Sequence, residues 1–351
     1  MKLYVRIMVS TLLLGLLVLS FFFRNEGLMD AYTSYIFIPY QQIRSSVFNG
    51  IGISIGDIVY VLLALLLLVS LIRLLFFLIR WPKKKLKLGK LLRRSIISLL
   101  LLYLCYFYSW GANYARHPVW APLQGDTSWN RAKLEALNDI LVQELNELAD
   151  DTLVYSFRKT NAILGAIYKR ASDEMLPDLW VKPSLFGEWM FYLGIQGYYN
   201  PLTGEAHVAK SLPAFMWPFV IAHEMAHQTG VAAEGEANFI AYVICVKSGD
   251  PVLQRSAYLN LFLYANRELS RKDEELAAQK KFALHTSIQA LLWELEEHRK
   301  KYKSSFSKFS LGIYNWMLQQ QGQDKGLRSY ADISRLVYLW EAAGEPEIKL
   351  R

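Results

Sequence analysis

Hydrophobic residues form three long runs in the first third of the chain, at residues 7–23, 58–79 and 95–110. Each run approaches the length of about 20 residues that a helix needs to cross the hydrocarbon core of a bilayer. The first run continues into Phe23-Arg24-Asn25 instead of a small-residue cleavage site, which favours an uncleaved anchor over a signal peptide. The pattern therefore predicts a membrane anchor over residues 1–111 with three transmembrane helices.

The pattern changes after the third run, and residues 112–351 read as a mostly helical globular domain. Between residues 193 and 210, glycines and an Asn-Pro pair separate short extended pieces, which predicts a small β-hairpin. The expected fold class is mainly α, with three N-terminal transmembrane helices followed by a helical domain that contains a small β-hairpin or sheet. Apolar residues recur at helical spacing over residues 132–148, 253–269, 275–302, 310–320 and 331–343.

The net charge of +8 comes from one basic segment, residues 80–94, which holds eight Lys and Arg and no acid. Subtracting these eight from the 39 basic residues leaves 31, which equals the number of acidic residues. A nucleic-acid-binding surface is therefore not needed to explain the charge, and no nucleic acid is expected as a partner. By the positive-inside rule, the N-terminus and the basic segment are cytoplasmic parts of a multi-pass plasma or inner membrane protein, and the basic segment is expected to be a loop between the second and third spans. Residues 112–351 are then extracytoplasmic, and the lipid bilayer is one partner.

The motif His-Glu-x-x-His occurs once, at residues 223–227. Side chains four residues apart share one face of a helix, so His223 and His227 can bind one metal ion. Glu224 lies beside them, where its carboxylate can act as a general base on a water molecule, as in zinc-dependent hydrolases. Pro218 suits the start of this helix. The motif predicts one Zn²⁺ ion, bound by the two histidines, and Glu224 as the catalytic residue.

A catalytic zinc site needs a third protein ligand. Gly230 can end the first helix, and a second helix beginning near Ala233 brings Glu234 or Glu236 back to the metal. Glu234 is favoured because Asn238 follows four residues later, and this spacing resembles the Glu-x-x-x-Asp pattern of gluzincins. There the Glu binds zinc and the Asp holds a ligand histidine. Glu236 stays the alternative ligand, since the sequence does not fix the phase of the second helix.

The chain as a whole resembles the domain-of-unknown-function 3810 family, and the resemblance covers nearly its full length. The family consists of bacterial membrane proteins with three spans that are placed among zincin-like peptidases, without an established substrate. In zincins, an edge strand before the zinc helix pairs with an extended substrate, which implies this role for Ala206, His207 and Val208. The resemblance rests on Ser54–Asp57, Trp110–Tyr114, Lys182–Phe186, Gly197–Ala206, His223–Gln228 and Glu234–Phe239.

The expected function is that of a membrane-anchored zinc peptidase that cleaves a peptide or protein substrate, with Glu224 as general base. The alternative is a zincin fold kept as a membrane binding or assembly module with weak catalysis. Asn238 favours this alternative because it brings no charge to a ligand histidine, whereas the intact Glu224 disfavours it. A donor that stabilises the transition state is also expected, and spacing singles out none of its candidates His207, Tyr198, Tyr199, Tyr314 and Tyr330.

Overall fold

The computed structural model describes residues 25–79, 85–123, 129–150, 152–172 and 176–348, together with Ser10, Leu14, Gly15 and Leu17. The predicted first transmembrane helix, residues 7–23, lies outside the described residues except at these four positions.

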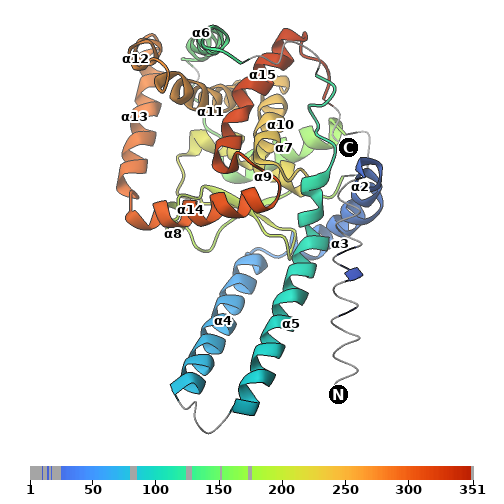
Figure 1. The fold of residues 1–351 in the computed structure, drawn as a ribbon. Helices are drawn as coiled ribbons and strands as arrows, with labels where there is room; N and C mark the ends of the chain where they lie inside the picture. The colour runs from blue at the N-terminus through green and yellow to red at the C-terminus, as the bar shows by residue number, and fades with distance from the viewer. Residues whose placement is uncertain are drawn as a thin grey trace.

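Two long helices, α4 (Ile55–Ile79) and α5 (Lys85–Ser109), extend from the same end of the globular part (Figure 1). Within the described residues, α4 alone is long and apolar enough to cross a membrane, over Ile55–Phe76, and the residues that follow its first turn are not buried. In α5 only 15 residues follow Arg94, which span about 22 Å and fall short of a hydrocarbon core of about 30 Å. The described residues thus contain one candidate span, and the third predicted span is confirmed only as a helix.

The basic segment 80–94 was expected to be a loop, and this is wrong for residues 85–94, which form the first turns of α5. The sequence there alternates Lys and Leu, both of which are good helix formers with little loss of side-chain freedom. The third helix was predicted to begin at residue 95, where the basic residues end, but α5 begins at Lys85. Basic residues do not end a helix, because their long side chains can reach polar surroundings from it.

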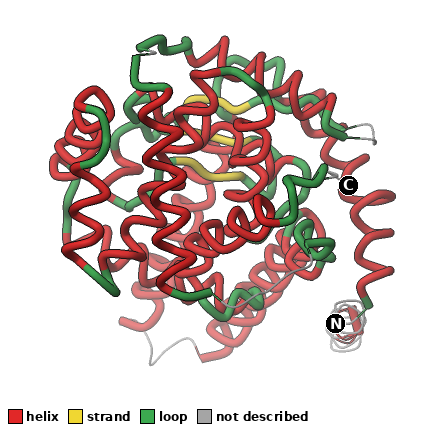
Figure 2. The backbone as a smooth tube through the Cα atoms, turned by 90° about the horizontal axis from the view of Figure 1, so that it is seen from above, coloured by secondary structure: helices red, strands yellow, loops and turns green. Residues whose placement is uncertain are grey.

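Helices make up most of the globular part, as predicted, and they surround three short strands (Figure 2). Its centre is the pair α9 and α10, which are buried along nearly their whole lengths; α9 also contacts α7 and α11, and α10 also contacts α11 and α15. The helices are α6 (Arg131–Glu147), α7 (Phe157–Arg170), α8 (Trp189–Tyr192), α9 (Trp217–Gln228), α10 (Glu234–Lys247), α11 (Pro251–Ser270), α12 (Glu274–Phe282), α13 (Thr286–Lys301), α14 (Ser305–Gln320) and α15 (Asp332–Ala342), with short 3-10 turns η3 (Gly111–Ala115), η4 (Ala214–Met216) and η5 (Gly326–Ala331).

The single helix predicted over residues 275–302 is instead two helices, α12 and α13. The break is fixed by Asn146 at the end of α6, whose Nδ2 donates to the carbonyl of Ala283 at 2.9 Å. Its Oδ1 accepts the backbone N–H of His285 at 2.7 Å, and the His285 side chain then caps α13 by accepting from Ser287 N–H. A contact from a distant helix thus overrides a locally continuous helical pattern.

The sheet contains β1 (Val181–Pro183), β3 (Ala206–Val208) and β2 (Gly197–Tyr199), in that spatial order. Strand β3 is antiparallel to β2, which confirms the predicted hairpin, and it is parallel to β1, which was not predicted. The expectation that Ala206, His207 and Val208 form an edge strand is therefore wrong. Both sides of β3 already pair with neighbours, so its backbone has no free side for a substrate.

The residues before α4 belong to the globular part, where they form α2 (Glu26–Tyr32), the π-helix η1 (Thr33–Phe37) and α3 (Ile38–Phe48). Buried Arg44 donates from Nη1 to the carbonyl of Pro201 at 2.6 Å and from Nη2 to the Tyr199 hydroxyl at 3.0 Å. Phe37 and Trp110 also lie in the same hydrophobic core as α9 and α10. The core is thus continuous across residue 111, where the sequence predicted the end of the anchor.

A buried ion pair joins the sheet to the start of α4. Lys182 Nζ on β1 lies 2.7 Å from Glu205 Oε1, and both side chains are almost fully buried. Lys182 also donates to the carbonyls of Phe48 and Ile53, at 2.6 and 3.1 Å. Glu205 accepts the backbone N–H of Gly56 at 2.5 Å, and so satisfies one of the donors that every helix leaves free in its first turn. This network fixes the direction in which α4 leaves the domain.

We predict that Lys182→Met strongly destabilises the protein, because it leaves the charge of Glu205 buried without a partner. Breaking a buried ion pair in this way lowers the free energy of unfolding by about 3–5 kcal/mol. The matched control is Lys325→Met, which removes a pair with Asp332 that is largely exposed and is expected to cost less than about 1 kcal/mol. Thermal unfolding of both variants in detergent checks the difference, and equal transition temperatures would contradict the role of the network.

We further predict that His207 makes the protein less stable in acid. Burial lowers the pKa of His207 to about 4, against partial opposition from the nearby Asp57 and Glu205 carboxylates. Its folded pKa lies below the unfolded value of about 6.5, so the unfolded chain binds the extra proton. The contribution of neutral His207 to the free energy of unfolding should therefore be fully present above pH 6.5 and be lost as the pH falls toward 4. Unfolding midpoints measured across this range should fall less in His207→Gln, and parallel pH profiles would refute the assignment.

Candidate metal centre

The two histidines of the motif are brought together by α9. Trp217 and Pro218 begin this helix, as predicted, and Pro218 fits because the first turn needs no backbone donor. His223 and His227 lie one turn apart on the same face, with ring centroids 4.7 Å apart in an edge-to-face arrangement. Gly230 adopts a φ of +88°, which reverses the chain after the helix, and α10 begins at Glu234.

Glu234 completes a compact group with the two imidazoles. Its Oε2 lies 3.2 Å from His223 Nε2 and 3.5 Å from His227 Nε2. Ligands about 2.0–2.1 Å from a tetrahedral zinc ion are separated by about 3.3 Å, which matches both distances. All three side chains are buried, and their ligand atoms lie within 4.8 Å of one another. Glu234 Oε2 has no hydrogen-bond partner among the described residues, so a cation would satisfy an otherwise orphaned buried oxygen. The residues present fit one zinc ion.

The charges of the group favour a cation as well. Burial alone would raise the pKa of Glu234, but the charge of His227 and the closeness of both imidazoles lower it well below its ordinary value. Burial lowers the pKa of His227, but the Glu234 carboxylate outweighs burial and raises that pKa to about 9. The pKa of His223 is lowered, chiefly by burial. The group therefore holds a buried negative charge that is balanced by a proton on His227, which a metal ion can replace.

Neighbouring groups fix the orientation of His227. Its Nδ1 lies 2.7 Å from the carbonyl of Val231, in the turn after α9, so this nitrogen carries the proton in the neutral ring and Nε2 faces Glu234. The ring of Trp110, at the end of α5, packs edge-to-face against it with centroids 5.6 Å apart. Trp110, which directly follows α5, thus contacts His227.

Asn238 lies one turn after Glu234 on α10. Its side chain contributes to the pKa of His223 by favouring the charged ring, and its Nδ2 donates to the carbonyl of Tyr330 at 3.3 Å. The Tyr330 ring stacks on His223 at a centroid distance of 6.3 Å and an interplanar angle of 15°. His223 Nδ1 has no hydrogen-bond partner among the described residues, so a hold of Asn238 on this ring stays a prediction.

Tyr314, on α14, contacts the metal centre directly. Its hydroxyl donates to Glu234 Oε1 at 2.5 Å and lies 3.4 Å from the Tyr330 hydroxyl. Burial and the Glu234 charge raise the pKa of Tyr314 well above its ordinary value, so it remains a donor. Of the candidates for a transition-state donor, these two tyrosines lie at the centre, whereas His207 stacks on Tyr198 and pairs with Ser54. Sequence spacing named these two tyrosines among five candidates but could not single them out, because they lie about 85 to 105 residues after the motif.

Glu224 lies against the backbone of β2. A side chain at Gly197 would approach Glu224 Oε1 and the carbonyl of His207 too closely, so glycine is required for the carboxylate to fit there. Burial raises the pKa of Glu224 to about 8. Its Oε2 has no hydrogen-bond partner among the described residues. A carboxylate with these properties can accept and return a proton near neutral pH.

Glu236, the alternative third ligand, lies away from the histidines. Its Oε1 accepts the backbone N–H of Val119 at 3.0 Å, and the Arg116 charge partly opposes the effect of burial, which raises its pKa to about 7. The phase of α10, which the sequence left open, thus turns Glu234 toward α9 and Glu236 toward the segment after η3. The ligand set that the geometry supports is His223, His227 and Glu234.

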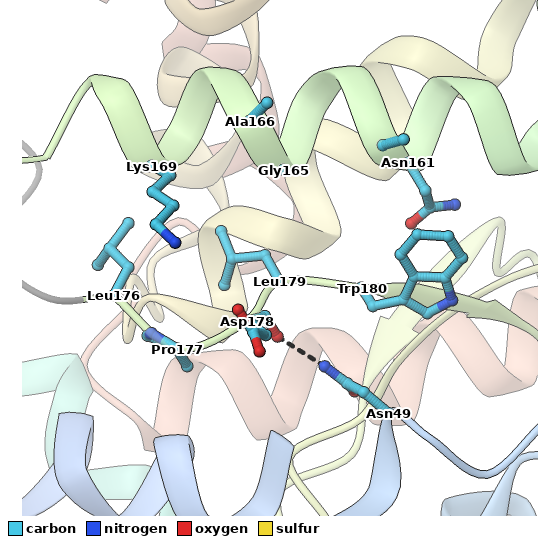
Figure 3. A pocket seen from close by; sticks show the side chains of 11 residues that line it. Asn49, Asn161, Gly165, Ala166, Lys169, Leu176, Pro177, Asp178, Leu179 and Trp180 are labelled. Atoms are coloured by element: carbon cyan, nitrogen blue, oxygen red, sulfur yellow. Dashed lines mark hydrogen bonds between the residues drawn. The ribbon is translucent and has the colours of Figure 1, made fainter. Parts of the chain in front are cut away.

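A surface hollow of about 480 Å³ lies elsewhere, between α7 and the segment before β1 (Figure 3). Its lining includes Lys169 and Asp178, and Asn49 donates to the Asp178 carbonyl at 2.6 Å. None of the residues of the metal centre lines it. The metal centre is the candidate functional site, because among the described residues it is the group where possible metal ligands and a further buried carboxylate converge.

Comparison with known proteins identifies the family. The profile described as "Protein of unknown function (DUF3810)" matches residues 32–338, and the chain belongs to this family. No curated protein and no solved structure matches the chain. The family description assigns no activity, so the function must be argued from the site.

We predict that the purified protein binds one zinc ion. Glu234→Ala, like His223→Ala or His227→Ala, should weaken zinc binding by more than about 100-fold. Mutating a residue that only hydrogen-bonds to a zinc ligand already weakens binding by about 10–100-fold, and loss of a ligand itself should cost more. Glu236→Gln is the matched control and should bind zinc as the wild type does. Metal content by mass spectrometry and titration with a zinc indicator measure both. Zinc binding that survives Glu234→Ala and is lost in Glu236→Gln would reverse the assignment.

Proposed function

We propose that this protein is a membrane-anchored zinc-dependent hydrolase that cleaves peptide bonds. The observation that carries the proposal is the convergence of His223, His227 and Glu234 from two helices, with Glu224 beside them. This set of two imidazoles and one carboxylate, together with an adjacent buried acid, is the arrangement of zinc peptidases.

The residues around the centre have complementary roles in this proposal. A bound zinc ion supplies Lewis-acid polarisation and lowers the pKa of a water molecule. Glu224 takes the proton of the attacking water at its carboxylate and delivers it to the leaving amine, for which a pKa of about 8 is well suited. Tyr314 and Tyr330 offer hydroxyl donors for the charge that develops on the carbonyl oxygen.

A peptide substrate is favoured by the position of β2. This strand lies at one side of the sheet and its Gly197 touches Glu224, so its unpaired side offers backbone donors and acceptors beside the acid. An extended peptide can add to such an edge as a further strand. The role that the sequence suggested for β3 is therefore proposed for β2.

The membrane location is part of the same proposal. We place α4 across the bilayer as one of three spans, with the basic residues before α5 in the cytoplasm and residues 112–351 outside. The supporting observation is that the apolar side chains of the candidate span beyond its first turn are not buried by the protein, so they need lipid around them.

A second candidate function is a membrane binding or assembly module that holds zinc without turnover. Two observations favour it: the neutral Asn238 stands behind His223, and the three ligand side chains are all buried, which limits access for a substrate. Zinc binding without cleavage of any member of a broad peptide library would select this function.

We predict that Glu224→Gln lowers peptide cleavage by about 10²–10⁴-fold, the usual contribution of a general base, while the zinc content stays the same. Glutamine keeps the size of the side chain but cannot accept the proton. Cleavage of a quenched fluorescent peptide library, with zinc measured in the same samples, tests this. Glu236→Gln serves as the control, and equal rates for Glu224→Gln and the wild type would rule out Glu224 as the base.

A further inference from the structure

Helix α14 exposes an apolar stripe that no described residue covers. Phe306, Phe309, Ile313 and Trp316 recur at spacings of three and four residues, which places them on one face. The rings of Phe306 and Phe309 lie 6.2 Å apart. The opposite face of the helix carries Tyr314 and the fully buried Leu318, so α14 is amphipathic with its outer face apolar. An exposed stripe of this kind marks an interaction surface.

The stripe continues onto the segment around α8, which α14 contacts. Leu185 and Trp189 there are exposed, and together with the four residues of α14 they are 51–74% exposed. The backbone N–H of Leu185 donates to Asp57 Oδ2 at 2.6 Å, and Asp57 lies in the first turn of α4. Leu185 is therefore held at the level where the candidate span begins.

We propose that α14 and the α8 segment form a surface that lies on the bilayer, with the aromatic stripe in the boundary between headgroups and acyl chains. Figure 1 shows α14 at the end of the globular part from which α4 leaves, lying across the direction of α4. The sequence of α14 contains Lys308 and no acid, as expected for a helix beside anionic lipid. This inference rests on the proposed membrane span of α4.

The bilayer explains this surface better than a second copy of the chain. A partner protein would need a matching surface, whereas continuity with the start of α4 makes lipid available to these side chains in every molecule. Phe and Trp with a flanking Lys are also the residues that prefer the membrane interface. Because Tyr314 on the other face of the same helix touches Glu234, the metal centre lies about one helix diameter, about 10–12 Å, from the bilayer surface. The substrate class that fits is a polypeptide segment close to the membrane.

Spin labels on the full chain in phosphatidylethanolamine–phosphatidylglycerol vesicles test the proposal without relying on activity. Single cysteines replace Phe309 and Trp316 in a Cys105→Ser, Cys245→Ala background, and power saturation compares oxygen, which enters lipid, with a nickel chelate, which stays in water. The ratio of oxygen to nickel accessibility should be several-fold higher at these positions than at Phe282→Cys. Phe282 is a matched control, exposed and apolar but on α12, far from α4 (Figure 1).

A label at Leu66→Cys in α4 separates the possible failures. If the label at 66 is in lipid and the labels at 309 and 316 are as accessible to nickel as the one at 282, the interfacial surface is overturned while the span stands. Shielding from both reagents, with dipolar broadening between copies, would show a protein interface and also overturn it. A label at 66 in water would refute the span and the surface together. Unchanged zinc content confirms that each labelled variant is folded.

Discussion

A carboxylate buried away from water requires a positive partner, and this requirement organises the centre of the molecule. Glu234 meets it with the imidazoles of His223 and His227, and each of those rings is in turn held by a different part of the chain. Val231 and Trp110 hold one ring, whereas Tyr330 and Asn238 lie against the other. The residues that surround the charge come from α5, α9, α10 and η5, so the packing of these elements depends on one ionised group.

A second buried charge pair serves a different purpose. Lys182 on β1 and Glu205 next to β3 bind the backbone at the start of α4, so α4 and the sheet beside Glu224 share one support. Strand β2 belongs to the same sheet and touches Glu224 through Gly197. The carboxylate of Glu224 is therefore positioned relative to α4, because the sheet contacts both of them. The two networks together explain why the globular part includes the residues before α4.

The sequence predicts the arrangement of residues that are close together in the chain, but not the contacts between residues that are far apart in it. The spacing of His223 and His227, and a second helix beginning near Glu234, follow from helix geometry and from the turn at Gly230. Tyr314 was one of five candidates and could not be singled out in this way, because its contact with Glu234 depends on how α14 packs. The position of β3 was also mispredicted, since its neighbour β1 lies about 25 residues earlier and pairs with it only through the tertiary fold. The choice between Glu234 and Glu236 as the third ligand depends on which face of α10 is turned toward α9, and the sequence does not determine this.

The connection between Lys182, Glu205 and the start of α4 has a consequence for biosynthesis. The partners that these two charges need are synthesised about 125 to 150 residues earlier, and α4 and α5 leave the ribosome before the sheet does. The buried charges of the sheet can be satisfied only after that earlier segment has reached its place beside them. Under the proposed function, metal binding must follow, because α9 packs on β3 and His223, His227 and Glu234 converge only in the folded domain. In the proposed topology, the ion is therefore loaded after translocation, from the pool available outside the cytoplasm.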